Sequence, residues 1–87
     1  MNDVEFVKKC KELVADYTNQ RIDKTSNVRV VPSGIYVVWQ VKALQNSKDL
    51  LSTVLPDGMY YEVTFNGDKN QIYLDAYKKF ENVEINL

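Results

Sequence analysis

The chain has 87 residues, of which 45% are hydrophobic and 26% are charged, a balance typical of one soluble globular domain spanning residues 1–87. Its 11 basic and 12 acidic side chains give a formal net charge of −1, so a role as a duplex nucleic-acid binder or a DNA mimic would need a local charged patch. No apolar run is long enough to cross a bilayer, no signal-peptide pattern is present, and one cysteine cannot form an internal disulfide, so we expect a protein of the reducing cytoplasm.

A helix is predicted over residues 3–21, because apolar side chains recur there with spacings of three, four and seven residues. This apolar stripe consists of Phe6, Val7, Cys10, Leu13, Val14 and Tyr17. Asn2 followed by Glu5 predicts a capping box at the start of the helix, with the Asn2 side chain accepting an unpaired backbone N–H. The polar residues 18–34 predict a connection that contains a short strand at residues 28–31.

From residue 35 onward the hydrophobic pattern changes to a period of two, which predicts β-strands. The residues expected on one buried face of the first strand are Ile35, Val37, Trp39, Val41 and Ala43. A turn is predicted at residues 45–47. Residues 48–55 follow as a second strand, with a short helix at residues 47–54 as the competing interpretation. A further turn is predicted at residues 56–58, where proline fixes φ and glycine accepts a positive φ.

Two more strands, at residues 59–65 and 71–77, are predicted to form a hairpin. Apolar residues take odd positions in the first of these strands and even positions in the second. Because partners in an antiparallel pair share a face, the two residue numbers of a pair must sum to an odd number. Either a two-residue loop (66–67) or a four-residue loop (67–70) satisfies this condition. Residues 82–87 alternate again and predict a short last strand.

Together these elements predict an α+β fold with one N-terminal helix packed on a curved, mainly antiparallel meander of four to five strands. By analogy, this two-layer arrangement is cystatin-like, although such an architecture hosts many functions. The sheet face expected under the helix consists of Val37, Trp39, Val41, Tyr61, Val63, Phe65, Ile72 and Leu74.

Side chains suited to catalysis or metal binding are scarce in this sequence. There is no histidine, and Cys10 lies on the apolar stripe, where we expect a buried and inert thiol. With the four-residue loop, Glu62 faces Asp75, and this pair is either mildly repulsive surface charge or a site for acid–base chemistry or cation binding. We interpret it as surface charge and therefore expect no enzymatic activity, no bound metal and no cofactor.

Four tyrosines are expected on the sheet face away from the helix. Cross-strand aromatic pairs reinforce sheets, but exposed tyrosines also form protein-binding surfaces, and the bases of single-stranded nucleic acid can stack on them. Nucleic-acid binding would require phosphate contacts from Lys42, Lys78 and Lys79. The candidate partner-binding residues are Tyr36, Tyr60, Tyr73, Tyr77, Lys42 and Glu62.

Several segments carry a resemblance to a known family: YVVW at 36–39, LQN at 44–46, LLST and LPDGMYYEVT within 50–64, and YKKFENV at 77–83. On these segments the chain resembles a small family of uncharacterised proteins encoded in phages and prophages of Gram-positive bacteria. The resemblance implies a bacterial host cytoplasm and an accessory role in infection or lysogeny, and it carries over no catalytic residue. We therefore expect a non-enzymatic accessory protein whose sheet surface binds a host or phage protein or a second copy of itself. The alternative is a single-stranded nucleic-acid-binding protein of phage replication or recombination.

Overall fold

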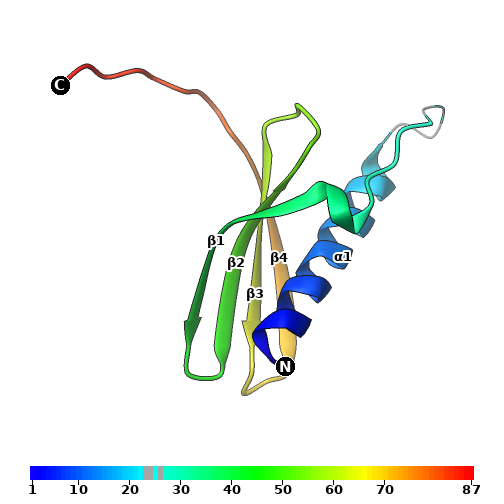
Figure 1. Cartoon of the computed structure of the whole chain (residues 1–87), viewed down its shortest axis with the longest axis vertical. Helices are drawn as coiled ribbons and strands as arrows, with labels where there is room; N and C mark the ends of the chain where they lie inside the picture. Colours follow the sequence, from blue (N-terminus) through cyan, green and yellow to red (C-terminus); the bar gives the residue numbers. More distant parts are fainter. Residues whose placement is uncertain (23–24, 26) are drawn as a thin grey trace.

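The computed structural model of the protein describes residues 1–22, 25 and 27–87. Its elements in chain order are α1 (Asp3–Arg21), the short 3₁₀ turn η1 (Pro32–Gly34), β1 (Ile35–Ala43), β2 (Asn46–Thr53), β3 (Met59–Asn66) and β4 (Gln71–Lys78), shown in Figure 1. The strands form one antiparallel sheet in the order β1-β2-β3-β4. The predicted α+β meander with an N-terminal helix is therefore confirmed, with four strands.

Helix α1 begins and ends where the sequence predicts. The Asn2 side chain accepts the backbone N–H of Glu5 at 2.8 Å, and its amide donates to the Glu5 carboxylate at 3.2 Å. This cap satisfies one N–H of the first turn, and Asp3 and Glu5 place negative charge at the positive end of the helix dipole. Neither α1 nor any other helix in the described residues combines the length and the apolar character needed to cross a membrane.

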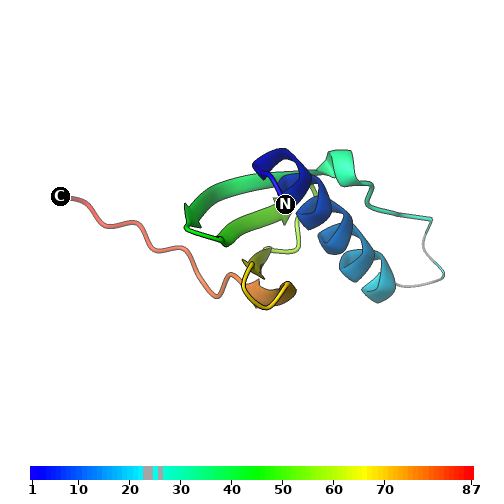
Figure 2. The same cartoon turned by 90° about the horizontal axis from the view of Figure 1, so that it is seen from below.

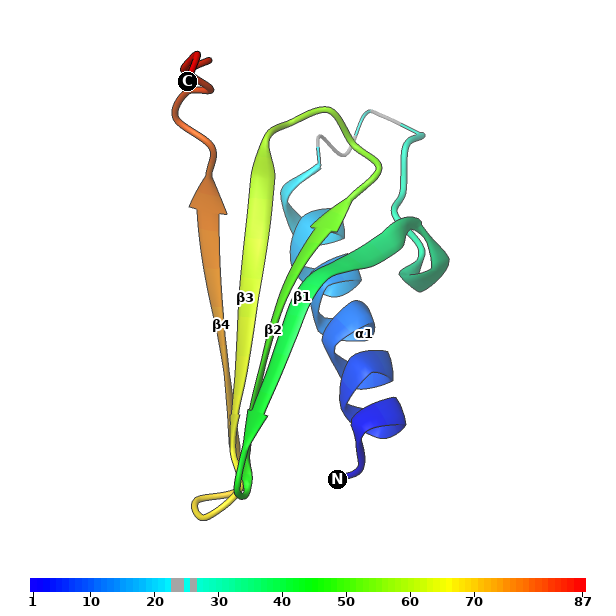
Figure 3. The ribbon, with the colours of Figure 1, turned by 60° about the vertical axis from the view of Figure 1, so that its left-hand side comes forward.

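The core lies between α1 and one side of the sheet, as Figure 2 shows from below. The Phe6 ring packs on Phe65 with ring centroids 6.2 Å apart, and Tyr17 meets the edge of Tyr61 at 5.6 Å. The buried apolar residues are Phe6, Cys10, Val14 and Ala15 of α1, Val30 of the connection, and Ile35, Leu51, Tyr61, Val63 and Phe65 of the sheet. Helix α1 lies on this side of the sheet only, and no element of the described chain covers the other side (Figure 3).

Strand β1 contains a β-bulge that reverses its alternation. Val37 pairs with Leu51, but the next pair joins Trp39 to Leu50, so Val38 is the extra residue. The prediction that Trp39 and Val41 lie in the core is therefore wrong: they are 42% and 53% exposed, on the side away from α1. One inserted residue moves every later side chain of the strand to the opposite face.

The β1–β2 and β3–β4 hairpins each have a short loop and a defined register. Residues 46–53 form a strand, which decides against the competing short helix. The turn before it lies at residues 44–45, with Leu44 at φ 57°, one residue earlier than predicted. The β3–β4 hairpin uses the four-residue loop, because Asn66 pairs with Gln71. Within this loop the Asn66 side chain accepts two backbone N–H groups, and Asn70 takes a positive φ.

Two predicted strands are absent from the described residues. Residues 28–31 are not a strand; instead Val30 is buried, and its backbone exchanges two 2.8 Å hydrogen bonds with the Asn19 side chain of α1. An amide side chain thus takes the place of a neighbouring strand. Residues 82–87 are also not a strand, because the chain after β4 runs away from the sheet and finds no strand beside it (Figures 1 and 2).

Candidate protein-binding surface

The side of the sheet opposite α1, which we call the outer face, is organised in three rows that cross all four strands. The strand register gives the rows as Tyr36–Ser52–Tyr60–Tyr77, Trp39–Leu50–Glu62–Asp75 and Val41–Lys48–Thr64–Tyr73. Side chains opposite one another on neighbouring strands are in contact distance, so each row is a line of touching neighbours. Large apolar or aromatic side chains stand at the β1 end of all three rows, and tyrosines stand at the β4 end of two of them, while Asp75 ends the middle row.

The β1 end of the outer face is the more apolar one. Tyr36, Val38, Trp39 and Val41 follow one another along this strand, and each is about half exposed. Partly buried Leu50 of β2 lies directly beside Trp39. Tryptophan and tyrosine in such a group offer a large contact area at little cost in side-chain entropy, which is the composition of binding hot spots.

The charges of the outer face are mixed and mainly acidic. Lys48 forms an ion pair with Glu62, with Nζ and Oε1 3.4 Å apart. Asp75 stands opposite Glu62 on the next strand, so two carboxylates meet one ammonium group within the three rows. This part of the sheet therefore lacks the excess of positive charge that phosphate contacts require.

Five of the six candidate binding residues lie on this surface. Tyr36, Tyr73 and Tyr77 are exposed and Tyr60 and Glu62 are half-buried, all in the three rows. Lys42 does not lie there. After the bulge it points to the helix side, where its Nζ lies 3.4 Å from the Asp3 carboxylate of α1.

The residues that sequence reasoning missed are Trp39, Val41 and Leu50. Residues 35–39 are apolar without interruption, so this run fits a strand of either parity. Apolar residues also continue at odd positions after the bulge, so the sequence pattern gives no sign that these positions have moved to the other face. No residue in the run marks the bulge, because none is a glycine or a proline.

The helix side of the sheet contains a buried acid, Asp49, beside the thiol of Cys10. Asp49 is 0% exposed, and neither of its oxygens has a conventional hydrogen-bond partner among the residues that the structure describes. Burial, and next the Asp3 carboxylate, raise the pKa of Asp49, and the weakly donating Cys10 thiol opposes this shift only in part. Burial and then the Asp49 charge raise the pKa of Cys10 to about 12.

This Asp49–Cys10 pair does not form a reaction centre. A thiol with so high a pKa holds its proton at neutral pH, and the nucleophile of cysteine chemistry is the thiolate. Both side chains are also sealed beneath α1, out of reach of a dissolved substrate. In the described part of the chain, no group of three or more acidic, cysteine or histidine side chains is placed to hold a metal ion.

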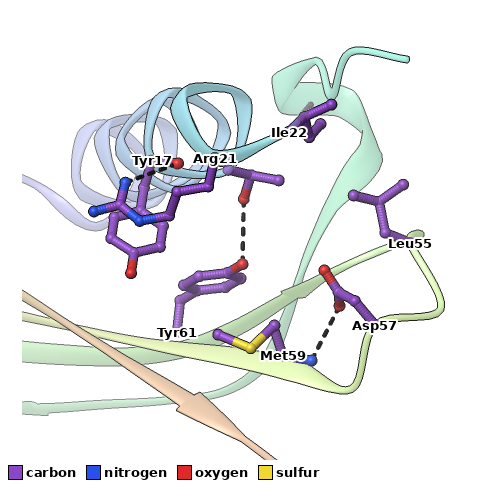
Figure 4. A pocket seen from close by; sticks show the side chains of 8 residues that line it. Tyr17, Arg21, Ile22, Leu55, Asp57, Met59 and Tyr61 are labelled. Carbon is purple, nitrogen blue, oxygen red and sulfur yellow. Dashed lines mark hydrogen bonds between the residues drawn. The ribbon is translucent and has the colours of Figure 1, made fainter. Parts of the chain in front are cut away.

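A small pocket opens where the C-terminal end of α1 meets the β2–β3 loop (Figure 4). Its volume is about 240 Å³, and its lining includes Tyr17, Arg21, Leu55, Asp57, Met59 and Tyr61. The polar groups that line it already interact within the protein. Thr18 donates to the Tyr61 hydroxyl at 3.3 Å, and Asp57 accepts the Met59 N–H. The Arg21 guanidinium lies 3.4 Å from the centre of the Tyr17 ring. Ligand pockets usually exceed about 300 Å³ and offer unpaired polar groups, so the outer face is the stronger candidate.

Comparison with known proteins gives the chain a family. No curated protein and no solved structure matches it. A model of a family of unknown function, DUF6275, matches residues 7–87, which is nearly the whole chain. The protein therefore belongs to the DUF6275 family.

Proposed function

We propose that this protein is a non-enzymatic binding module that docks a protein partner on the β1 end of its outer face. The observation that carries the proposal is the exposed Trp39, which the bulge turns away from the core together with Val41. A tryptophan and its aliphatic neighbours on a flat, uncovered sheet form an apolar patch of the kind that marks interaction sites.

The chemistry of the outer face describes the partner. Apolar side chains of the partner would cover Tyr36, Trp39 and Val41, while a lysine or arginine would meet the acidic pair of Glu62 and Asp75. A cation at this position would relieve the repulsion between the two carboxylates, and charge complementarity of this kind favours the correct orientation of a complex.

We place this partner in a phage setting. The resemblance of the segments at 36–39, 44–46, 50–64 and 77–83 to phage and prophage proteins supports an accessory role, with a host or phage protein as the partner. A single-stranded nucleic acid could stack on the same rings, but the mixed charges of the outer face do not favour it.

The test compares three versions of the chain as bait in cells of the bacterium that carries the gene. The variant Trp39→Ser/Val41→Ser removes the apolar patch, and Val4→Ser removes a valine of α1 that is more exposed than Val41, as the control. We expect the double variant to recover at least about tenfold less of the partner than the wild type does, because two central contacts disappear. Its thermal unfolding should change little, because both side chains are half exposed already.

Equal recovery of the same proteins by all three baits would overturn the proposal. Oligonucleotide binding is measured alongside, over a range of salt concentrations. Tight binding that weakens steeply with salt and is lost in the double variant would favour the nucleic-acid alternative.

A further inference from the structure

The chain beyond β4 is an extended segment without a partner. Residues 79–87, which we call the tail, leave the sheet at the end of β4, bend away from the strand and run out from the body of the molecule (Figure 1). The Lys79 N–H still donates to the Gly58 carbonyl at 2.8 Å, but residues 80–87 make no backbone hydrogen bond to any described residue. Phe80 is 96% exposed.

The tail nevertheless has the sequence of a strand. Val83, Ile85 and Leu87 alternate with polar residues, and all three apolar side chains are exposed. Alternation of this kind predicts a strand with one buried face. A strand pattern without a neighbouring strand indicates that the neighbour belongs to another molecule.

The tail cannot easily fold back on its own sheet. Each of the chain's sheet reversals contains a residue with positive φ: Leu44, Gly58 or Asn70. None of the residues 79–87 has a positive φ, and residues 79–81 include no glycine, proline or asparagine that would favour a tight turn. The backbone groups of the tail are therefore open to a strand from a second chain.

The free edge of β4 is suited to receive such a strand. All eight residues of β4 pair in unbroken register with β3, and the strand contains neither proline nor glycine. The other free edge, that of β1, is interrupted by the bulge at Val38, a device that protects edges from pairing. A straight edge strand of this length is a template for strand addition.

We infer that two copies of this chain associate around a two-fold axis, with the tail of each copy adding as a strand to the β4 edge of the other. When one segment pairs antiparallel with its own copy, the two residue numbers of a pair sum to an even number, so odd residues face odd residues. Val83, Ile85 and Leu87 then fall on the outer face, beside the odd-numbered tyrosines of β4. The inference goes beyond the proposed function, which places its partner on the β1 end of the outer face.

The charges select the position of the axis. An axis at Phe80 places Lys79 opposite Glu81 of the second copy. An axis one residue earlier or later would instead oppose two copies of Lys79 or two copies of Glu81.

The axis at Phe80 also gives each tail two aromatic contacts. Val83 stands opposite Tyr77 of the second copy, and Leu87 stands opposite Tyr73. Aromatic and aliphatic cross-strand neighbours of this kind stabilise paired strands. Ile85, between them, stands opposite Asp75, so two of the three apolar residues of the tail cover the exposed tyrosines of β4.

The first experiment measures self-association by analytical ultracentrifugation of the full chain. The wild type should form a species of twice the 10.1 kDa chain mass as its concentration rises. Val83→Asp should weaken this dimer at least about tenfold, because the new charge would be buried against Tyr77. The matched control, Asn82→Asp, adds the same charge beside Lys78 of the second copy and should leave the dimer intact.

The second experiment locates the axis by mild oxidation. Phe80→Cys should form a disulfide between two copies, because residue 80 faces itself across the axis. Glu84→Cys, four residues further along the same parity, should not. The native Cys10 is buried and does not interfere.

A wild type that stays monomeric at every concentration would overturn the inference, and so would equal effects of Val83→Asp and Asn82→Asp. The proposed function is tested separately. Val83→Asp should still capture the partner of the β1 end, and Trp39→Ser/Val41→Ser should still dimerise. A dimer that is lost only in the Trp39→Ser/Val41→Ser variant would place self-association at the β1 end and overturn the tail exchange.

Discussion

The two faces of the same sheet use their residues in opposite ways. Under α1, Leu51 and Val63 are sealed from water, yet the same side also buries the carboxylate of Asp49. On the outer face, Trp39 and Tyr36 stay about half exposed although both would suit a core. An arrangement selected for stability alone would exchange such residues. The comparison supports the proposal that the outer face contacts another molecule, and each prediction below tests one part of that contrast.

The largest effect is expected from a pair of neighbouring leucines. Leu51 is fully buried on the helix side, whereas Leu50 lies beside Trp39 on the outer face and is only partly buried. Leu51→Ala should lower the free energy of unfolding by about 2–5 kcal/mol, since it removes buried methyl groups and leaves a cavity. Leu50→Ala should cost about 1 kcal/mol or less, because its site stays open to water. Urea denaturation monitored by circular dichroism measures both.

A chain of this size has a total stability of only a few kcal/mol to somewhat above ten, at about 0.05–0.15 kcal/mol per residue. Leu51→Ala could therefore fail to fold, and Leu51→Val provides a milder substitution at the same site. If Leu50→Ala proved as costly as Leu51→Ala, the outer face would be covered within the monomer. The contrast between the two faces would then be lost.

Sequence patterns predicted most of the fold for physical reasons that are local. The 3.6-residue spacing and the Asn2 cap predicted α1, and the change of parity between β3 and β4 correctly restricted their loop to an even length. Each of these signals depends on residues close together in the chain, so no knowledge of tertiary contacts is needed to interpret them.

The bulge and the tail depend on information that the local pattern lacks. Inserting Val38 changes which side of β1 meets α1, and this choice is made by packing across the whole sheet. Tyr36, Tyr60, Tyr73 and Tyr77 therefore lie on the face that local alternation predicts, whereas Trp39, which follows the bulge, does not. The tail has the alternation of a strand, but alternation does not specify where the neighbouring strand comes from.

A smaller effect is expected from Asp49, the polar residue on the apolar side. Asp49→Asn keeps the shape of the side chain but removes its ability to ionise. At pH 7 we expect the variant to be more stable than the wild type by about 1–3 kcal/mol, because the amide cannot ionise and so removes the penalty of burying an acid, although it too lacks a hydrogen-bond partner. Urea denaturation of both chains between pH 4 and pH 7 measures the difference.

The pH dependence of this difference follows from the raised pKa of Asp49 in the folded state. Below the ordinary value of 3.8, both the folded and the unfolded chain hold the proton, so the stability contribution of neutral Asp49 is fully present. As the pH rises, the unfolded chain releases the proton more readily, and this contribution is lost until the pH passes the folded-state pKa. Wild-type stability should therefore fall relative to Asp49→Asn above pH 4. Parallel curves for the two chains would show that Asp49 reaches water.

The smallest effect concerns the acidic pair on the outer face. Glu62 faces Asp75, and Lys48 neutralises only Glu62. Asp75→Asn should raise the free energy of unfolding by about 0.2–1 kcal/mol, because like charges on opposed residues repel. Added salt should shrink this gain by screening the repulsion, whereas Asp68→Asn in the exposed β3–β4 loop should show no such gain. If Asp75→Asn stabilises the fold and also weakens capture of the partner, the unpaired carboxylate serves binding at the expense of stability. If it stabilises without affecting capture, the contact with the partner is carried by the apolar β1 end alone.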